Sequence, residues 1–158
     1  HRYLPSEANY MQDSILADAD LSPADLSPEL TKHFRGMRMW LPLKLFGVDT
    51  FKAALKEKAY LTQYFYEEVQ KLGFEVGPKP SLSVMIYRYA PKNMNLKATN
   101  QFNKKLVEHI RLDGRVFLTS TTLDGVYWIR VAVLSFRTHL KHMDIILEIL
   151  KEGIKNTQ

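Results

Sequence analysis

The sequence VFLTSTTLDGVYWIRVAVL at residues 116–134 decides the fold, because it holds two runs of strand-forming residues around one turn. Asp124-Gly125 lies between the runs and is typical of a two-residue β-hairpin turn, in which both central positions take a positive φ. We therefore predict strands at 116–121 and 126–134 that pair as an antiparallel hairpin.

Helical and extended segments alternate on either side of this hairpin. Apolar residues at helical spacing predict four helices, at 27–47, from 49 or 50 to a stop at Gly73, at 98–112, and from 138 or 139 to 150. Strand-forming residues predict two further strands, at 74–76 and 83–89. The order of elements predicts an α+β fold, in which long linking helices precede a small antiparallel sheet with helices on one face.

The first predicted helix begins at Ser27-Pro28-Glu29, where a capping serine precedes a proline and an acidic residue in the first turn. Pro42 is expected to kink this helix or end it early, because proline lacks the backbone N–H. Gly47 is expected to close it. Its surface is apolar over more than one face, through Met37, Met39, Trp40, Leu43 and Phe46.

The charge of the chain is unevenly distributed. Residues 1–30 hold one base and six acids, whereas the rest of the 158 residues holds 21 bases and 11 acids. A hydrophobic content of 46% can supply a core, so we do not expect disorder. No apolar run reaches the ~18 residues of a membrane span. The absence of cysteine excludes disulfides, thiolate metal sites and cysteine nucleophiles.

Arg130 is the most informative charged residue. Alternation along its strand places it on the same face as Trp128, Ala132 and Leu134. Because burying an unpaired charge is costly, the guanidinium needs either an anionic partner or a water-filled cleft. The partner is either an anionic ligand, bound by two parallel hydrogen bonds, or an acidic side chain such as Glu75 or Glu108. The residues alone favour the structural ion pair.

His139 and His142 lie three residues apart on one helical face. No third ligand is evident, so we expect a solvated face and no metal site.

Tyr87, Tyr89, Tyr127 and Trp128 lie on predicted strands in a basic part of the chain, which is typical of base-stacking surfaces. No glycine-aromatic motif of RNA-binding sheets accompanies them, so strand packing explains them better. The alternative function is a non-enzymatic interaction or nucleic-acid-binding α+β module. Such a module would bind RNA or DNA through Tyr87, Tyr89 and Trp128.

Two longer stretches resemble a known enzyme family. Residues 26–47, LSPELTKHFRGMRMWLPLKLFG, are similar to the FRxLKMW…G helix of the pyridoxal-phosphate-dependent amino-acid decarboxylases of group II. This group acts on aromatic amino acids, histidine, tyrosine or glutamate. Residues 114–138, GRVFLTSTTLDGVYWIRVAVLSFRT, are similar to the last hairpin of the same enzymes, where a hydrophobic-Arg-hydrophobic-Ala strand leads into the terminal helix.

The resemblance implies the carboxy-terminal portion of a fold type I enzyme. Residues 1–26 would be an acidic arm with the mobile catalytic loop, 27–72 the linking helices, and 73–158 the small carboxy-terminal α+β domain. The start at His1 is expected for a fragment, either a cloned domain or a proteolytic product. The parent would be a cytoplasmic, homodimeric lyase that releases carbon dioxide from an L-amino acid held as external aldimine, with pyridoxal 5'-phosphate as cofactor.

The implied partners are the large pyridoxal-phosphate-binding domain of the same protein, a homodimer mate and the amino-acid substrate. Neither a membrane nor nucleic acid is expected as a partner. The apolar side chains of the first helix would contact the large domain or the dimer mate, so in this chain they are expected to be exposed.

Three residues carry over from the family. Tyr10 corresponds to a loop tyrosine that protonates the α-carbon after decarboxylation, a role that suits a phenol because it is a neutral donor at pH 7. Thr31 corresponds to a substrate-binding position that borders the substrate side chain across the dimer interface. Arg130 matches the strand arginine near the substrate carboxylate, so the resemblance favours its functional interpretation.

The chain departs from the family in two respects. Lys32-His33 stand where the family often has two arginines. The Schiff-base lysine, which follows a histidine in the family, is absent, because only the reverse order occurs, in Lys32-His33 and Lys141-His142. We therefore expect no cofactor-binding residue in this chain, and we expect the chain alone to be inactive.

Overall fold

Residues 33–157 are described in the computed structural model of the chain. The helices are α2 (Met37–Lys71), α3 (Leu96–Asp113) and α4 (Leu140–Thr157). The strands are β1 (Phe74–Val76), β2 (Val84–Tyr89), β3 (Thr119–Leu123) and β4 (Val126–Ala132). Gly47 and Val48 mark the boundary between two units of the chain, each of which is considered by itself below.

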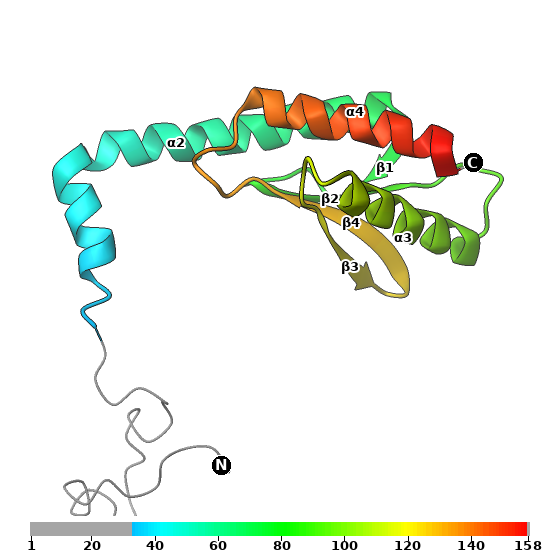
Figure 1. The fold of residues 1–158 in the computed structure, drawn as a ribbon, viewed down its shortest axis with the longest axis horizontal. Helices are drawn as coiled ribbons and strands as arrows, with labels where there is room; N and C mark the ends of the chain where they lie inside the picture. Colours follow the sequence, from blue (N-terminus) through cyan, green and yellow to red (C-terminus); the bar gives the residue numbers. More distant parts are fainter. Residues whose placement is uncertain (1–32, 158) are drawn as a thin grey trace, which may run out of the picture. The chain divides into compact units, whose positions relative to one another are not determined.

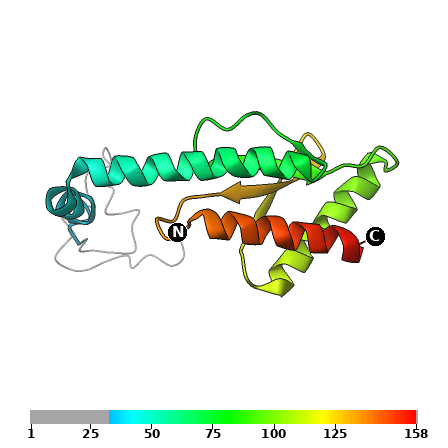
Figure 2. The ribbon, with the colours of Figure 1, turned by 90° about the horizontal axis from the view of Figure 1, so that it is seen from above.

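The four strands form one antiparallel sheet in the order β1-β2-β4-β3. In the unit from Val48 onward, the second half of α2, α3 and α4 all lie on one face of this sheet (Figures 1 and 2). The α+β class, with a small antiparallel sheet and helices on one face, is confirmed.

The hairpin predicted at Asp124-Gly125 is present. Asp124 has φ 49° and Gly125 has φ 77°, the pair of positive values that a two-residue turn of this kind requires. Its strands pair from Leu123–Val126 to Thr119–Arg130. The strand expected from residue 116 begins only at Thr119. Arg115, just before this segment, forms ion pairs with Asp113 at the end of α3 and with Glu152 on α4, which tie the chain here to these two helices.

The first helix differs from the prediction at its start. Residues 33–36 are not helical, and α2 begins at Met37. The first helical hydrogen bond runs from the Trp40 N–H to the Gly36 carbonyl at 2.9 Å, so glycine occupies the capping position. The predicted start at Ser27-Pro28-Glu29 lies outside the described residues, and a helix that runs unbroken from there is wrong.

Pro42 does not end the helix, contrary to the expectation of an early end. Its missing N–H removes one hydrogen bond, and helical geometry continues on both sides of it. The break occurs at Gly47, with φ 74° and ψ 162°, as predicted. Gly47 tolerates this positive φ because it has no Cβ.

The core lies between the helices and the sheet. Phe65 and Tyr87 are fully buried and meet edge to face, with ring centroids 5.3 Å apart. Phe74 packs on the other side of Tyr87 at 5.6 Å. Burial raises the pKa of the Tyr87 phenol, because removal from water disfavours the charged phenolate. The Tyr87 hydroxyl has no hydrogen-bond partner among the described residues. The inward positions of β2 and β4 are therefore occupied by core side chains.

Polar contacts join the second half of α2 to α4 and the loop before it. The Tyr64 hydroxyl donates to Asp144 at 2.7 Å, which raises the pKa of Tyr64 to about 12. Lys58 is 4% exposed, and its ammonium group donates to the carbonyls of Thr138 and Phe136. Glu57 accepts from Lys58 and contacts His139 Nδ1, each at 2.7 Å.

Glu57 makes the stability of the chain depend on pH. The hydrogen bond from Lys58, and then that with His139, lowers the pKa of the Glu57 carboxyl below its ordinary value of 4.5. A carboxyl whose pKa is lower in the folded state stabilises the fold above the unfolded pKa and loses that contribution as the pH falls through the folded value. We therefore expect Glu57→Gln to lower the melting temperature at pH 6 and to have less effect near pH 3.

Thermal unfolding followed by circular dichroism at both pH values checks this expectation. Glu67→Gln is a matched control, because Glu67 lies exposed on the same helix and accepts only from the neutral Gln63 amide. An equal loss of melting temperature at both pH values for Glu57→Gln would contradict the assignment.

Candidate functional site

The face of the sheet opposite the helices, here called the outer face, carries the candidate site. Ile129 and Val131 are 0% and 3% exposed and point to the helices, so Trp128 and Arg130 between them point the other way. Cross-strand register places Thr119 and Ile86 on either side of Arg130. Antiparallel pairing thus brings three strands together around one arginine.

Arg130 is exposed, and its guanidinium is held by a neutral side chain. Its Nε donates to the Thr119 hydroxyl at 2.9 Å. Within residues 33–157 its two terminal nitrogens have no hydrogen-bond or ion-pair partner. This arrangement leaves a positive charge and two terminal nitrogens without a described partner on the outer face. Two such parallel N–H groups can bind a carboxylate through two hydrogen bonds.

Within residues 33–157, Arg130 does not form the structural ion pair with Glu75 or Glu108 that the residues alone favoured. Glu75 pairs instead with Arg88, at 2.7 Å from its Nη2, and Glu108 lies 3.5 Å from Arg111. Glu75 stands opposite Arg88 in the β1–β2 register, and Glu108 lies one turn from Arg111 on α3. Each acid therefore meets the arginine that the backbone places nearest to it.

A second arginine on the outer face was missed by sequence reasoning. Arg88 lies over the Trp128 ring, with its Cζ 4.9 Å from the centroid, and donates from Nε and Nη2 to Glu75. Its Nη1 is buried without a partner among the described residues. Alternation along β2 would have placed Arg88 on the face opposite Tyr87, and this was the available signal.

The other two predicted site residues, Tyr10 and Thr31, lie outside the described residues. Of the three predicted site residues, the structure therefore describes Arg130 alone.

The histidine pair is accounted for by local contacts. His139 Nδ1 faces Glu57, and the His139 backbone N–H donates to His142 Nδ1 at 3.0 Å. Over residues 33–157, no group of three or more His, Asp or Glu side chains has an arrangement that could hold a metal ion.

The aromatic surface proposed for nucleic-acid binding is wrong. Tyr87 is fully buried and Tyr89 packs against the Phe102 ring at 5.2 Å, both on the helix-covered side. Trp128 lies on the outer face beneath Arg88. Strand packing, the better explanation from the sequence, is confirmed for Tyr87 and Tyr89.

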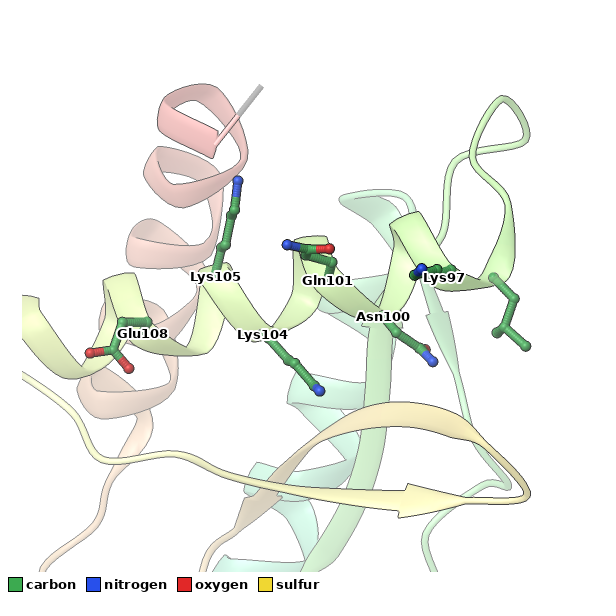
Figure 3. A pocket seen from close by; sticks show the side chains of 7 residues that line it. Lys97, Asn100, Gln101, Lys104, Lys105 and Glu108 are labelled. Atoms are coloured by element: carbon green, nitrogen blue, oxygen red, sulfur yellow. The ribbon is translucent and has the colours of Figure 1, made fainter.

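A shallow groove along the exposed side of α3 is the other surface of note (Figure 3). It is lined by Leu96, Lys97, Asn100, Gln101, Lys104, Lys105 and Glu108. The Asn100 side chain binds the backbone of the hairpin, because it donates to the Gly125 carbonyl and accepts from the Tyr127 N–H. The lysines are exposed, so this groove is a solvated helix face that anchors the hairpin.

The described lysines do not fit a Schiff base to pyridoxal phosphate. Lys58 is the one buried lysine among residues 33–157, and its ammonium group is bound to Glu57 and to two backbone carbonyls. The other described lysines are exposed.

None of the helices described between residues 33 and 157 has the combination of length and apolar character needed to cross a bilayer.

Curated relatives of the chain carry the names of decarboxylases and aldehyde synthases. Tryptophan decarboxylase 2 of Oryza sativa subsp. japonica is 25% identical over 124 residues, which are 78% of this chain and 25% of that protein. A phenylacetaldehyde synthase of Petunia hybrida is 29% identical over 130 residues, 77% of this chain and 26% of the relative. The chain thus spans about a quarter of the length of these relatives. No protein-family model matches it.

Solved structures share the fold. The tryptophan decarboxylase of Catharanthus roseus, in complex with L-tryptophan, superposes with a TM-score of 0.73 at 25% identity, over 84% of this chain and 28% of that one. An Oryza sativa enzyme solved with pyridoxal phosphate and tryptamine gives a TM-score of 0.75 at 18% identity, over 85% of this chain and 29% of that one. In sequence and in fold, the chain matches the carboxy-terminal portion of the pyridoxal-phosphate-dependent amino-acid decarboxylases.

Proposed function

We propose that this chain is the carboxy-terminal part of a pyridoxal-phosphate-dependent amino-acid decarboxylase, a carboxy-lyase that acts in the cytoplasm as a homodimer. One observation carries the proposal: the outer face presents Arg130 with two free guanidinium nitrogens and no acidic partner among the described residues. The similarity to tryptophan and tyrosine decarboxylases supports it and suggests an aromatic L-amino acid as substrate.

In this proposal Arg130 binds the carboxylate of the amino acid. The exposed guanidinium carries a permanent positive charge, and the parallel N–H groups match the two oxygens of a carboxylate. This contact holds the group that leaves as carbon dioxide in one orientation, which is a positioning effect.

Two residues outside the described part complete the proposed site. The Tyr10 hydroxyl would deliver a proton to the α-carbon, and Thr31 would border the substrate side chain. The cofactor would bind in the large domain, outside this chain, and would supply the electron sink for the reaction.

The proposed partners are that large domain and a second copy of the protein. Residues 37–47 form a helix with several exposed apolar side chains, including Met39 at 72% and Phe46 at 65% exposure. Met37 and Trp40 are also exposed, whereas Leu43 is half-buried. Apolar surface of this extent on one short helix is typical of an interface.

We expect the isolated chain to associate in solution through this helix. Trp40→Asp with Phe46→Asp should weaken self-association by more than tenfold, because a carboxylate in an apolar interface is costly to desolvate. Leu112→Asp, at a leucine on α3 that is 79% exposed, is the control and should have little effect. Sedimentation velocity over a concentration series measures the change. A wild-type chain that stays monomeric at every concentration would refute self-association through this helix.

The proposed activity is tested on the full-length protein. Reconstituted with pyridoxal phosphate and offered aromatic and acidic L-amino acids, it should release carbon dioxide from at least one of them. The chain of 158 residues alone, under the same conditions, should release none above the buffer rate. Turnover by the chain alone, or no carbon dioxide from the full-length protein with any of these amino acids, would overturn the proposal.

A further inference from the structure

We propose that Thr119 is a positioning residue, which fixes the Arg130 guanidinium so that a carboxylate ligand is bound through its two terminal nitrogens. This inference rests on the proposed function of Arg130 and adds the residue that orients it.

Thr119 and Arg130 are register partners across the β3–β4 ladder. The Thr119 hydroxyl oxygen accepts a hydrogen bond from Arg130 Nε at 2.9 Å. The same oxygen lies 3.5 Å from the backbone carbonyl of Arg130, toward which its own proton is directed. One hydroxyl therefore links the side chain of Arg130 to the backbone of the strand that carries it. As a β-branched residue in a strand, threonine has few χ1 alternatives, so the hydroxyl is held in place.

This contact selects one edge of the guanidinium. An arginine can offer a carboxylate either the Nε and Nη pair or the two Nη nitrogens. Because Thr119 occupies Nε, the pair of terminal nitrogens remains for a ligand. Without the hydroxyl, the long side chain would sample several rotamers, and the ligand would have to order it on binding.

Arg88, the other arginine on the outer face, has an acidic partner in place of a hydroxyl, and its charge is neutralised as a result. Arg88 lies on the same outer face, but its Nε and Nη2 both donate to the Glu75 carboxylate. Its charge is thereby compensated within the chain. Arg130 is held at the equivalent Nε by a neutral hydroxyl, so its orientation is fixed while its charge stays uncompensated by any described residue.

The test compares Thr119→Val with Thr119→Ser in the full-length enzyme reconstituted with its cofactor. Valine keeps the branched shape suited to the strand and removes the hydroxyl, whereas serine keeps the hydroxyl. Thr119→Val should raise KM for the amino-acid substrate by about tenfold, the size expected for one hydrogen bond to a charged group. It should change kcat by less than about threefold, and Thr119→Ser should restore KM to near the wild-type value.

Two further measurements separate positioning from a general structural effect. The inhibition constant of the corresponding amine, which lacks the carboxylate, should be unchanged in Thr119→Val. Thr121→Val is the matched control, because Thr121 lies on the same strand and face opposite Trp128 and should leave KM unchanged. Melting temperatures verify that each variant is folded.

The outcomes distinguish the inference from the function on which it rests. An active enzyme in which Thr119→Val leaves KM unchanged, or weakens amine and amino acid equally, overturns the role of Thr119 alone. An enzyme that releases no carbon dioxide from any amino acid tested overturns the proposed function and this inference with it.

Discussion

Arg130→Gln in the full-length enzyme is expected to lower kcat/KM for the amino-acid substrate by about 100-fold. The variant removes a permanent charge and a two-hydrogen-bond contact to a carboxylate, and hydrogen bonds to charged groups contribute about 1.5–3 kcal/mol each. Because Arg130 is exposed, water weakens its attraction to a carboxylate in the isolated chain. A bound substrate and the large domain would exclude water and strengthen this attraction in the full-length enzyme. The substitution should weaken binding of the amino acid and leave the inhibition constant of the corresponding amine, which has no carboxylate, nearly unchanged.

Graded variants make this expectation sharp. Arg130→Lys keeps the charge and loses the paired N–H geometry, so its loss should be intermediate, about tenfold. Arg111→Gln is the matched control, because Arg111 is an exposed arginine on α3 whose partner is Glu108 at 3.5 Å. Steady-state kinetics with the amino acid, together with inhibition by its amine, measures both effects. Equal losses for Arg130→Gln and Arg111→Gln would show that Arg130 has no specific role.

The parts of the fold that rest on local chemistry could be predicted from the sequence. The hairpin follows from Asp124-Gly125, because both positions need a positive φ and these residue types tolerate it. The end of the first helix at Gly47 follows from the same property. The start of that helix could not be predicted, since Ser27-Pro28-Glu29 is a strong starting signal while Gly36 provides the first helical acceptor.

Which side chains of β2 and β4 meet could not be predicted, because no short turn joins these strands and fixes their register. Alternation placed Arg130 and Trp128 on one face, as observed. It could not match that face to either face of β2 without knowing that Tyr87 stands opposite Ile129. A shift of one residue exchanges the two faces of a strand, so the sequence alone does not show whether Tyr87 shares a face with Trp128. The same unknown concealed that Arg88 lies beside Trp128, whereas the place of Thr119 opposite Arg130 follows from the two-residue turn, which fixes the β3–β4 register.

Asn103 provides the prediction with the largest expected effect on stability. It is fully buried on α3, and its side-chain amide bonds both backbone groups of Tyr89: Oδ1 accepts from the N–H and Nδ2 donates to the carbonyl, each at 2.8 Å. Nδ2 also donates to the Thr99 carbonyl at 2.8 Å. Pairing of β2 with β4 ends at Tyr87. The Asn103 amide thus supplies the hydrogen-bond partners for the backbone N–H and carbonyl of Tyr89, the last residue of β2.

Asn103→Leu is expected to lower the free energy of unfolding by about 3 kcal/mol. Leucine fills the space but leaves the N–H and carbonyl of Tyr89 without partners, and each buried unsatisfied group costs about 1–3 kcal/mol. Urea unfolding followed by far-ultraviolet circular dichroism measures the change. Gln101→Leu, at an exposed position of the same helix, is the control and should change stability by less than about 0.5 kcal/mol.

Asn103→Asp distinguishes a lost hydrogen-bond network from a general packing defect. At pH 7 the new carboxylate would be buried beside the carbonyls of Tyr89 and Thr99, which it repels, so the variant should be strongly destabilised. Burial and these carbonyls raise the pKa of such a carboxyl above its unfolded value of about 3.9. The protonated form is therefore favoured in the folded state and can donate to a carbonyl again, so part of the loss should be recovered as the pH falls toward 4. A packing defect would instead give the same deficit relative to wild type at both pH values, and that result would refute the role assigned to the Asn103 amide.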